Sequence, residues 1–297
     1  MSEKLSESPN NASRPAKKSS EFGRILKQMS YNRLAIVGLI IFILEILLAA
    51  FAPLITRYDP NVMDIFAVSQ SPSWKHIFGT DDLGRDIFSR ILYGGRYSLS
   101  MGILSILLSS ICGIFIGSIA GYFGGIVDNI IMRFLDIIQS LPGMLLTIVI
   151  SATLGPGYLN TILALAVNGI SGQARLLRAQ MMQVRNSEYI EAARASNCSQ
   201  VRIIISHLLP NSFSPLIVQA SMGTALMITM ASGLSFIGLG VQPPTPEWGS
   251  MLANSRLFIR DYPHMVIFPG LAIAITVLAL NLLGDGLRDA LDPKLKR

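Results

Sequence analysis

The chain contains six long runs of apolar residues, which constrain its fold more than any other feature. An α-helix needs roughly 20 apolar residues to cross the hydrocarbon core of a bilayer. The runs cover residues 34–55, 98–123, 134–154, 158–172, 214–240 and 264–284. Hydrophobic residues make up 51% of the chain and charged residues only 14%, a composition typical of membrane proteins. We therefore predict an all-α polytopic membrane protein with about six transmembrane helices, of which the fourth is the shortest.

Basic residues flank these runs unevenly and predict the orientation of the chain. Cytoplasmic loops carry an excess of Lys and Arg, and the segment before the first run is rich in them: Lys4, Arg14, Lys17, Lys18, Arg24, Lys27 and Arg33. An even number of spans returns the C-terminus to the same side, where it carries Lys294, Lys296 and Arg297. We expect both termini in the cytoplasm. Residues 1–20 lack the apolar surface needed to fold, and we expect them to be disordered.

Several kinds of chemistry are missing from the sequence. The net charge of +6 follows from the basic cytoplasmic segments, and the interleaved aromatic residues of a nucleic-acid interface do not accompany it. Cys112 and Cys198 lie in segments of different depth, so we expect neither a disulfide nor a metal site. No Gly-x-x-x-x-Gly-Lys-Ser/Thr motif occurs, so the chain is not expected to bind ATP itself.

One long polar segment, residues 173–211, interrupts the hydrophobic half of the chain and has Glu191-Ala192-Ala193 at its centre. Asn186 or Ser187 can cap a helix over residues 188–195, whose first turn holds acids that suit the positive end of the helix dipole. Asn197 then stands where the helix should end, because Asn tolerates the left-handed conformation. We predict a second helix over residues 200–209, ended by Pro210.

The first of these helices has two competing interpretations. Ala192 and Ala193 would offer a small-residue surface that a partner could approach closely, with Glu191 as a charged anchor for an Arg of that partner. The alternative is a solvated loop with ordinary alanines. The triplet alone does not separate the two.

Motifs along most of the chain resemble one membrane-protein family. Glu191-Ala192-Ala193, the turn at Asn197 and Leu209-Pro210 look like the EAA loop of binding-protein-dependent ABC importer permeases. Residues 76–86 (HIFGTDDLGRD), 242–249 (QPPTPEWG) and 281–289 (NLLGDGLRD) are similar to segments of the C-type permeases of dipeptide and oligopeptide importers. The family usually has Gly where this chain has Asn197, so we expect the turn to persist with some strain.

The resemblance implies a type I ABC importer permease fold in the bacterial inner membrane. It implies that Glu191, Ala192, Ala193, Asn197, Leu209 and Pro210 belong to the surface that couples to an ATPase. The implied partners are a homologous second permease, two ATPase subunits that use ATP and Mg, a solute-binding protein outside the membrane, and lipid. We expect a cytoplasmic tail (1–33), a first span with an outer loop (34–97), a core permease domain (98–287) containing the loop 173–211, and a C-terminal tail (288–297).

The cargo implied is a dipeptide or short oligopeptide, and three alternatives stay open. Related importers carry nickel, glutathione or other small solutes on similar scaffolds. A self-powered secondary transporter would couple to an ion through Glu45, the one acid near the middle of a span, although a neutral or hydrogen-bonded packing role for Glu45 is the interpretation we favour. A membrane scaffold without transport is the third alternative.

Two further groups of residues are candidates for the transport path and the outer surface. Asn168, Gln219 and Met222, with Met227 and Met230, are candidates to line the path, although methionines at helical spacing often serve packing. Asp81, Asp82, Arg85 and Asp86 could form a carboxylate metal site, but their opposite charges favour a turn held by internal salt bridges. The resemblance places that turn toward the binding protein.

Overall fold

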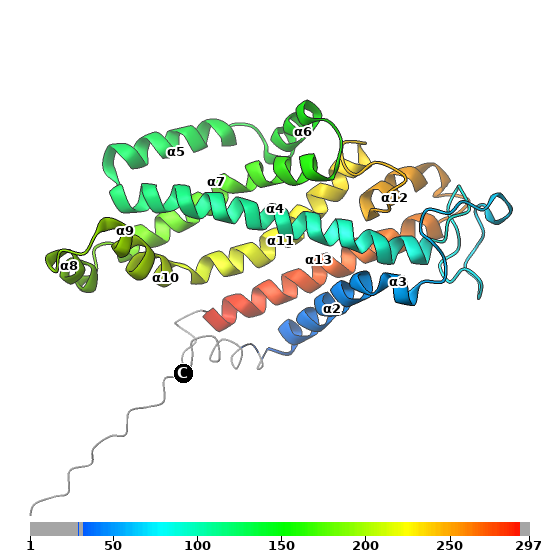
Figure 1. The fold of residues 1–297 in the computed structure, drawn as a ribbon, viewed down its shortest axis with the longest axis horizontal. Coiled ribbons are helices and arrows are strands. Elements are labelled where there is room, and N and C mark those ends of the chain that lie inside the picture. Colours follow the sequence, from blue (N-terminus) through cyan, green and yellow to red (C-terminus); the bar gives the residue numbers. More distant parts are fainter. Residues whose placement is uncertain (1–28, 30–31, 292–297) are drawn as a thin grey trace, which may run out of the picture.

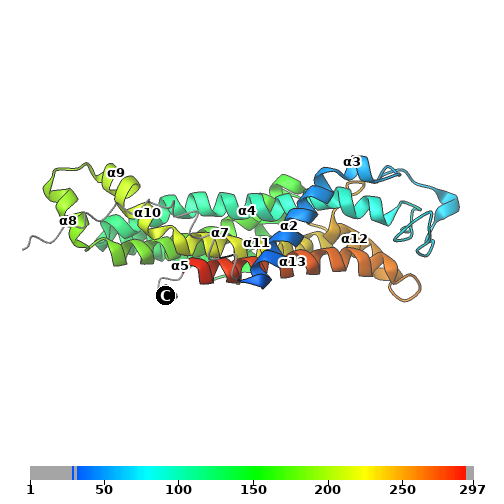
Figure 2. The same ribbon diagram turned by 90° about the horizontal axis from the view of Figure 1, so that it is seen from below.

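The structure, a computed structural model, is a bundle of long helices and describes residue 29 and residues 32–291. It contains no β-strand within that part of the chain, only one isolated bridge between Thr80 and Asp86. Figures 1 and 2 show an elongated bundle whose helices run roughly along its long axis. The expected tails lie almost wholly outside the described residues, including Lys294, Lys296 and Arg297.

The elements follow one another as a series of long helices with short helices at the two ends. In chain order they are α2 (Arg33–Ala50), α3 (Ala52–Ile55), η1 (Ile65–Ala67), α4 (Ile87–Phe123), α5 (Gly125–Gln139), α6 (Gly143–Leu154), α7 (Tyr158–Val184), α8 (Glu188–Ala195), α9 (Gln200–Arg202), the π-helix η2 (Ile203–Leu208), α10 (Leu209–Ser212), α11 (Ser214–Phe236), α12 (Trp248–Ser255), η3 (Arg256–Phe258) and α13 (His264–Leu291).

Four of the predicted spans correspond to single helices that are long and apolar enough to cross a membrane: α2, α4, α11 and α13. The second begins earlier than expected, at Ile87 instead of residue 98, because Asp86 caps it. The Asp86 carboxylate accepts hydrogen bonds from the backbone N–H and the hydroxyl of Ser89, both at 2.8 Å. With 37 residues, α4 is about 55 Å long and reaches well beyond the hydrocarbon core on at least one side.

The third and fourth spans differ from the prediction. The run 134–154 is not one helix: α5 and α6 meet at an angle of 81°. The break falls at Ser140-Leu141-Pro142, because proline lacks the N–H that would continue a helix and restricts the residue before it. The fourth helix, α7, continues to Val184. Its polar residues, among them Gln173, Arg175 and Arg178, keep it outside the group of helices that qualify as spans by hydropathy.

The paired helices α4 and α7 pack closely through a stripe of glycines on α4. Gly113, Gly117 and Gly121 recur every four residues and therefore share one helix face. A Cβ atom at Gly117 would lie 2.5 Å from the carbonyl oxygen of Ala174, and one at Gly121 would lie 2.9 Å from Cβ of Met181. Such small-residue stripes allow helix backbones to approach within a membrane. The stripe thus fixes α7, and with it the segment that follows.

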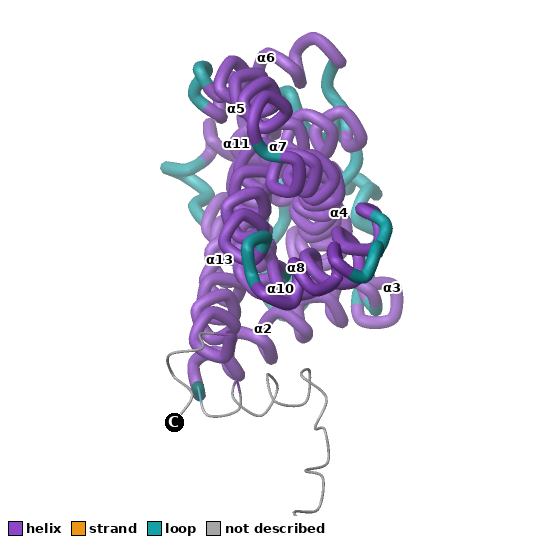
Figure 3. The backbone as a smooth tube through the Cα atoms, turned by 90° about the vertical axis from the view of Figure 1, so that its left-hand side faces the viewer, coloured by secondary structure: helices purple, strands orange, loops and turns teal. Residues whose placement is uncertain are grey.

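The chain passes back and forth between two ends of the bundle. The end of α7, the short helices α8 to α10 and the start of α11 gather at one end (Figures 1 and 3). The segments that connect α3 to α4 and α11 to α13 lie at the opposite end (Figures 1 and 2). At its start, α2 is tied to the last helix, since the Asn32 amide donates a hydrogen bond of 3.2 Å to Asp289. By length and composition the described residues hold four candidate spans, or five if the bent pair α5–α6 is one span, and α7 runs between the same two ends beside α4 (Figure 1).

Candidate functional site

The candidate coupling surface is α8, which protrudes beyond the long helices at one end of the bundle (Figures 1 and 2). Its inner face carries Ile190, which is fully buried, and Ala193, which is 8% exposed. Both pack in a cluster with Leu177 and Met181 of α7 and with Leu216 of α11. This anchoring joins α8 to the two helices between which it lies in the sequence, so a displacement of α8 would bear directly on them.

The opposite face of α8 is open to solvent and carries Glu191 and Ala192. Glu191 forms no ion pair within the described part of the chain. Of the two alanines expected to offer a partner a small surface, only Ala192 is exposed, because Ala193 faces the core. The structure thus divides the triplet: Glu191 and Ala192 are available for contact, and Ala193 packs.

The start of α8 follows the expected pattern only in part. Ser187 is the N-cap residue with extended backbone, and Glu188 and Glu191 lie in the first turn. The Ser187 side chain does not cap the helix, because its hydroxyl donates a 2.7 Å hydrogen bond to the carbonyl of Val184. The Ser187 hydroxyl therefore stabilises the turn between α7 and α8 by bonding to the end of α7, and it does not cap α8.

Asn197 ends α8 in the left-handed conformation, with φ of +56°, as the sequence predicts. The backbone N–H of Cys198 donates to the carbonyl of Ala193 at 3.1 Å, and the N–H of Asn197 donates to that of Arg194 at 2.9 Å. These two bonds make a Schellman motif, which satisfies carbonyls that a helix end leaves free. The apolar contact that accompanies the motif is also present, since Cys198 packs against the cluster that holds Ala193. Asn at this position preserves the turn.

The second helical stretch does not end at Pro210, contrary to the prediction. Residues 203–208 form a π-helix, and α10 carries the chain through Pro210 to Ser212. A proline ring within an α-helix collides with the carbonyl four residues earlier, here that of Ser206. The wider π turn relieves this collision, and the N–H of Leu209 bonds instead to the carbonyl of Ile204. Leu209 is half-buried and Pro210 exposed.

Arginines of α7 and α8 tie this end of the bundle to the corner between α4 and α5. The Arg178 guanidinium binds the carboxylate of Asp128 through both Nε and Nη2, with a 2.8 Å bond from Nε. Arg185 donates a 3.1 Å hydrogen bond to the carbonyl of Tyr122, and Arg194 of α8 lies over the Tyr122 ring, 6.0 Å from its centre. Sequence reasoning did not identify these arginines as structural ties, because their partners are some 50 to 70 residues away along the chain.

The candidate path residues do not meet in one place. Gln219 and Met222 of α11 line a groove of about 370 Å³ together with Ser214 and Arg288, two residues that sequence reasoning missed. Arg288 could have been identified from the sequence, because it belongs to the NLLGDGLRD motif. Asn168 lies elsewhere, beside the break between α5 and α6, where a Cβ atom on Gly143 would be 2.6 Å from its Oδ1.

The methionines of α11 likewise lie in different surroundings. Met227 is 3% exposed and packs in a core with Ile162 and Leu165, which is the packing role. Met230 packs at the edge of that core, and its sulfur is 3.7 Å from the Asn168 amide nitrogen.

At the opposite end, the acidic cluster is a structural turn. The Arg85 side chain donates to Asp81 at 2.7 Å, and Arg90 lies 3.6 Å from the same carboxylate. Asp86 caps α4 and contacts His76 at 2.9 Å. Within the described residues, no group of three or more His, Cys, Asp or Glu is arranged to hold a metal ion. The salt-bridged turn therefore accounts for Asp81, Arg85 and Asp86.

Glu45 lies on α2, half-buried, beside Thr276 of α13. One of its carboxyl oxygens, Oε2, is buried without a hydrogen-bond partner. No ion pair to Glu45 occurs within residues 32–291. This environment agrees with a packing role for a neutral side chain at the contact between α2 and α13.

Comparisons with known proteins match this arrangement to one family. Residues 113–297 match the family described as "Binding-protein-dependent transport system inner membrane component", and residues 20–72 match "N-terminal TM domain of oligopeptide transport permease C". The fold resembles a structure entitled "Inward facing conformations of the MetNI methionine ABC transporter", with a TM-score of 0.53, 17% identity, and coverage of 68% of this chain and 96% of that one.

Curated relatives are similar over nearly their whole length. The Dipeptide transport system permease protein DppC of Alkalihalophilus pseudofirmus is 48% identical, with 91% of this chain and 89% of the relative aligned. The Di/tripeptide transport system permease protein DppC of Pseudomonas aeruginosa is 43% identical, with 91% of each chain aligned. The Glutathione transport system permease protein GsiD of Pectobacterium atrosepticum is 45% identical, with 92% and 90% aligned. The chain therefore belongs to the binding-protein-dependent transport system inner membrane components, with the fold of a type I ABC importer permease, and is a multi-pass transport subunit of the inner membrane.

Proposed function

We propose that this chain is a permease subunit of an ATP-driven importer for dipeptides or short oligopeptides, and that α8 receives the ATPase. The observation that carries the coupling role is the two-sided character of α8. Ile190 and Ala193 fix it to α7 and α11, while Glu191 and Ala192 face solvent on the far side. An ATPase can shift the permease only through contacts that differ between its conformations, and α8 offers such a contact.

In the proposed orientation, α8 and both termini are cytoplasmic. The basic residues before α2 and within residues 173–211 support it through the positive-inside bias. Labelling tests it: Ala192→Cys and Trp74→Cys, each in a background with Cys112 and Cys198 replaced by Ser, are treated with a membrane-impermeant maleimide in intact cells. We expect labelling at position 74 only. Labelling at position 192 in intact cells would show that the orientation is the opposite of the one proposed.

The proposed assembly contains a homologous second permease, two ATPase subunits that bind ATP and Mg, and a solute-binding protein outside the membrane. Family membership supports the ATPases and the binding protein. For this chain we propose no cofactor of its own, and we keep the domain organisation expected from the sequence, with residues 98–287 as the core. Within the core, the groove lined by Gln219, Met222 and Arg288 and the α5–α6 break beside Asn168 are the proposed parts of the path.

Peptide cargo is supported by the names of the relatives, which include dipeptide, di/tripeptide and glutathione permeases. Glutathione is itself a small peptide-like solute and is the second candidate. Uptake of a labelled dipeptide into proteoliposomes that hold the whole transporter and its binding protein tests the proposal. Unlabelled dipeptide should compete and nickel should not, whereas uptake of labelled glutathione without uptake of the dipeptide would select the second candidate.

Energy coupling separates the importer from a secondary transporter. We expect uptake to require ATP and to persist when a protonophore collapses the proton gradient. Glu45→Gln should leave ATP-driven uptake largely intact, since Glu45 has no charged partner in the described bundle. Uptake that continues without ATP and stops with the protonophore would refute the importer.

A further inference from the structure

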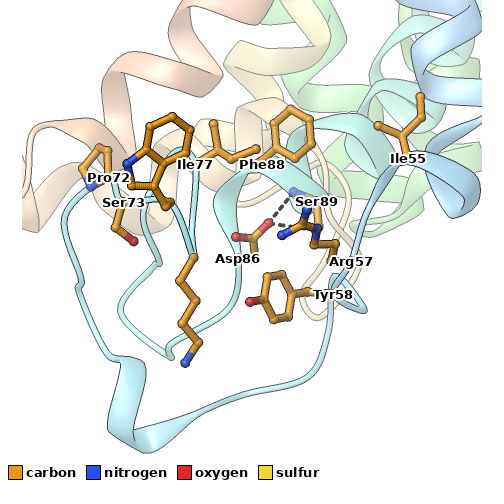
Figure 4. Close-up of a pocket in the computed structure, with 11 residues that line it drawn as sticks. Ile55, Arg57, Tyr58, Pro72, Ser73, Ile77, Asp86, Phe88 and Ser89 are labelled. Carbon is orange, nitrogen blue, oxygen red and sulfur yellow. Dashed lines mark hydrogen bonds between the residues drawn. The ribbon is translucent and has the colours of Figure 1, made fainter.

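A cavity of about 980 Å³ lies at the end of the bundle opposite α8, where the α3–α4 connection covers the start of α4 (Figure 4). Its wall is formed by Ile55, Arg57 and Tyr58, by residues 72–75 and Ile77, and by Asp86, Phe88 and Ser89. The coupling role of α8 does not use this cavity. Its wall combines aromatic and aliphatic side chains with two cations.

The apolar part of the wall is unusually open. Trp74 is 99% exposed and Ile77 56%. Next to Ile55, Leu54 of α3 is 82% exposed. A Trp side chain in water with nothing packed on it is costly, and exposed apolar patches of this kind mark contacts with a partner or with a membrane.

The charged part of the wall is positive. Arg57 and Lys75 are both exposed, and neither forms an ion pair within the described residues. The one acid in the wall, Asp86, is already occupied by His76 and by the N–H and hydroxyl of Ser89. Exposed Arg and Lys side chains without an acidic partner can bind a phosphate, which accepts charge-assisted hydrogen bonds from them.

The cavity begins where the first span ends, which places it at the surface of the bilayer. The last carbonyls of α2, those of Ala49 and Ala50, accept hydrogen bonds of 2.7 and 2.8 Å from Arg96. Together α2 and α3 end at Ile55, and Ile55 and Arg57 are already in the cavity wall. Trp and Tyr with basic residues at the end of a span are typical of the level where hydrocarbon gives way to headgroups.

We propose that this cavity binds the headgroup of an anionic phospholipid, with its phosphate on Arg57 and Lys75, its glycerol region against Trp74, and its acyl chains along Leu54 and Ile55. An acidic segment of a partner protein would also meet the cations. The continuity of the cavity with the exposed apolar surface of α3 favours a lipid. Assignment to the outer leaflet rests on the proposed orientation of the chain, whereas the lipid site itself does not.

The chain offers a direct probe, because its two tryptophans are Trp74 and Trp248, and Trp248 is 3% exposed in the core. The full transporter is placed in nanodiscs with increasing fractions of phosphatidylglycerol brominated on its acyl chains, and separately in brominated phosphatidylcholine. Subtraction of the signal of the Trp74→Phe transporter isolates Trp74 from Trp248 and from the tryptophans of the other subunits. We expect this difference signal to be quenched at low phosphatidylglycerol fractions and much less by phosphatidylcholine. Arg57→Gln and Lys75→Gln should each weaken the apparent affinity for phosphatidylglycerol about fivefold.

The matched control removes the same number of charges at the same end of the molecule. Arg256→Gln/Arg260→Gln should leave the titration unchanged, whereas Arg57→Gln/Lys75→Gln should flatten it. Equal quenching by both lipids, or equal effects of the two double variants, would overturn the anionic-lipid site. A Trp74 response to inorganic phosphate in phosphatidylcholine discs as large as that to phosphatidylglycerol would reassign the cavity to free anions. A response to the binding protein alone would reassign it to a partner.

Discussion

Arg178 of α7 and Asp128 of α5 form a two-pronged ion pair in which the carboxylate is nearly buried. The Asp128 side chain is 7% exposed and that of Arg178 31%, and the Nε–Oδ1 distance is 2.8 Å. A second pair between the same helices, Arg175 with Asp136, is 2.8 Å long but much more exposed, at 39% and 50%. Together the pairs hold α5 on the part of α7 that leads to α8.

The difference in burial between these pairs gives a matched comparison. Arg178→Gln leaves a buried carboxylate without its partner and should lower the free energy of unfolding by about 2–3 kcal/mol. Arg175→Gln breaks an exposed pair and should cost less than about 1 kcal/mol. Thermal unfolding of the purified transporter in one detergent measures both. Equal losses for the two variants would show that the buried pair has no special role.

Asn197 tests how the end of α8 is built. Asn197→Gly should be neutral or stabilise the turn by up to about 1 kcal/mol, because Gly adopts positive φ without a Cβ penalty. Asn197→Val should destabilise it by about 1–2 kcal/mol and reduce uptake, since the Schellman bonds to Ala193 and Arg194 require this conformation. Hydrogen exchange at the amides of residues 196–198 gives the local readout. If the amides of residues 196–198 exchange as slowly in Asn197→Val as in the unaltered protein, the requirement for a left-handed residue at position 197 is contradicted.

Gly117 tests the contact between α4 and α7. Gly117→Ala places a Cβ atom 2.5 Å from the Ala174 carbonyl and should cost about 1–3 kcal/mol by overpacking. Gly172→Ala is the control within the same pair of helices, because nothing lies within 4 Å of its Cβ position. It should be neutral or stabilise α7 by up to about 1 kcal/mol. Melting temperatures that shift alike for both variants would show that the stripe is not closely packed.

Asp82, in the turn before α4, gives a prediction about pH. Burial, and next the neighbouring Asp81, raise the pKa of Asp82 above its ordinary value, while Arg85 and Arg90 oppose the shift. A carboxyl whose pKa is raised on folding destabilises the folded state when ionised, and this cost disappears as the pH falls through the raised pKa. Asp82→Asn should therefore stabilise the protein slightly at neutral pH, by less than about 1 kcal/mol since the group is only half-buried. The gain should vanish in acidic buffer, and a gain that grows on acidification would contradict the assignment.

Helices and turns that follow from a local residue pattern could be predicted from the sequence. Contacts between residues far apart in the chain could not. The apolar runs predicted α2, α4, α11 and α13, and the permissive character of Asn predicted the turn at Asn197. The α5–α6 break was missed although Pro142 marked it, because hydropathy averaged over a window does not register a single proline. The π-helix before Pro210 was missed because its widened turn arises from accommodation of the ring and not from a sequence period. The burial of Ala193 and the ties from Arg178, Arg185 and Arg194 depend on contacts that only the folded bundle creates.

The solvent face of α8 carries the proposed coupling role, and retention of the ATPase by α8 variants tests this role most directly. Glu191→Lys and Ala192→Trp alter exposed side chains, so the permease should fold normally, as judged by its melting temperature. Each should weaken copurification of the ATPase subunits at least about tenfold. Glu191→Lys reverses a charge that contributes on the order of 2 kcal/mol or more once it is desolvated at an interface, and Ala192→Trp fills the small exposed surface that the ATPase would approach. Asp261→Lys, an equal charge reversal at the opposite end of the molecule, should retain them fully. Normal ATPase retention by both α8 variants would contradict the proposal that α8 is the coupling surface.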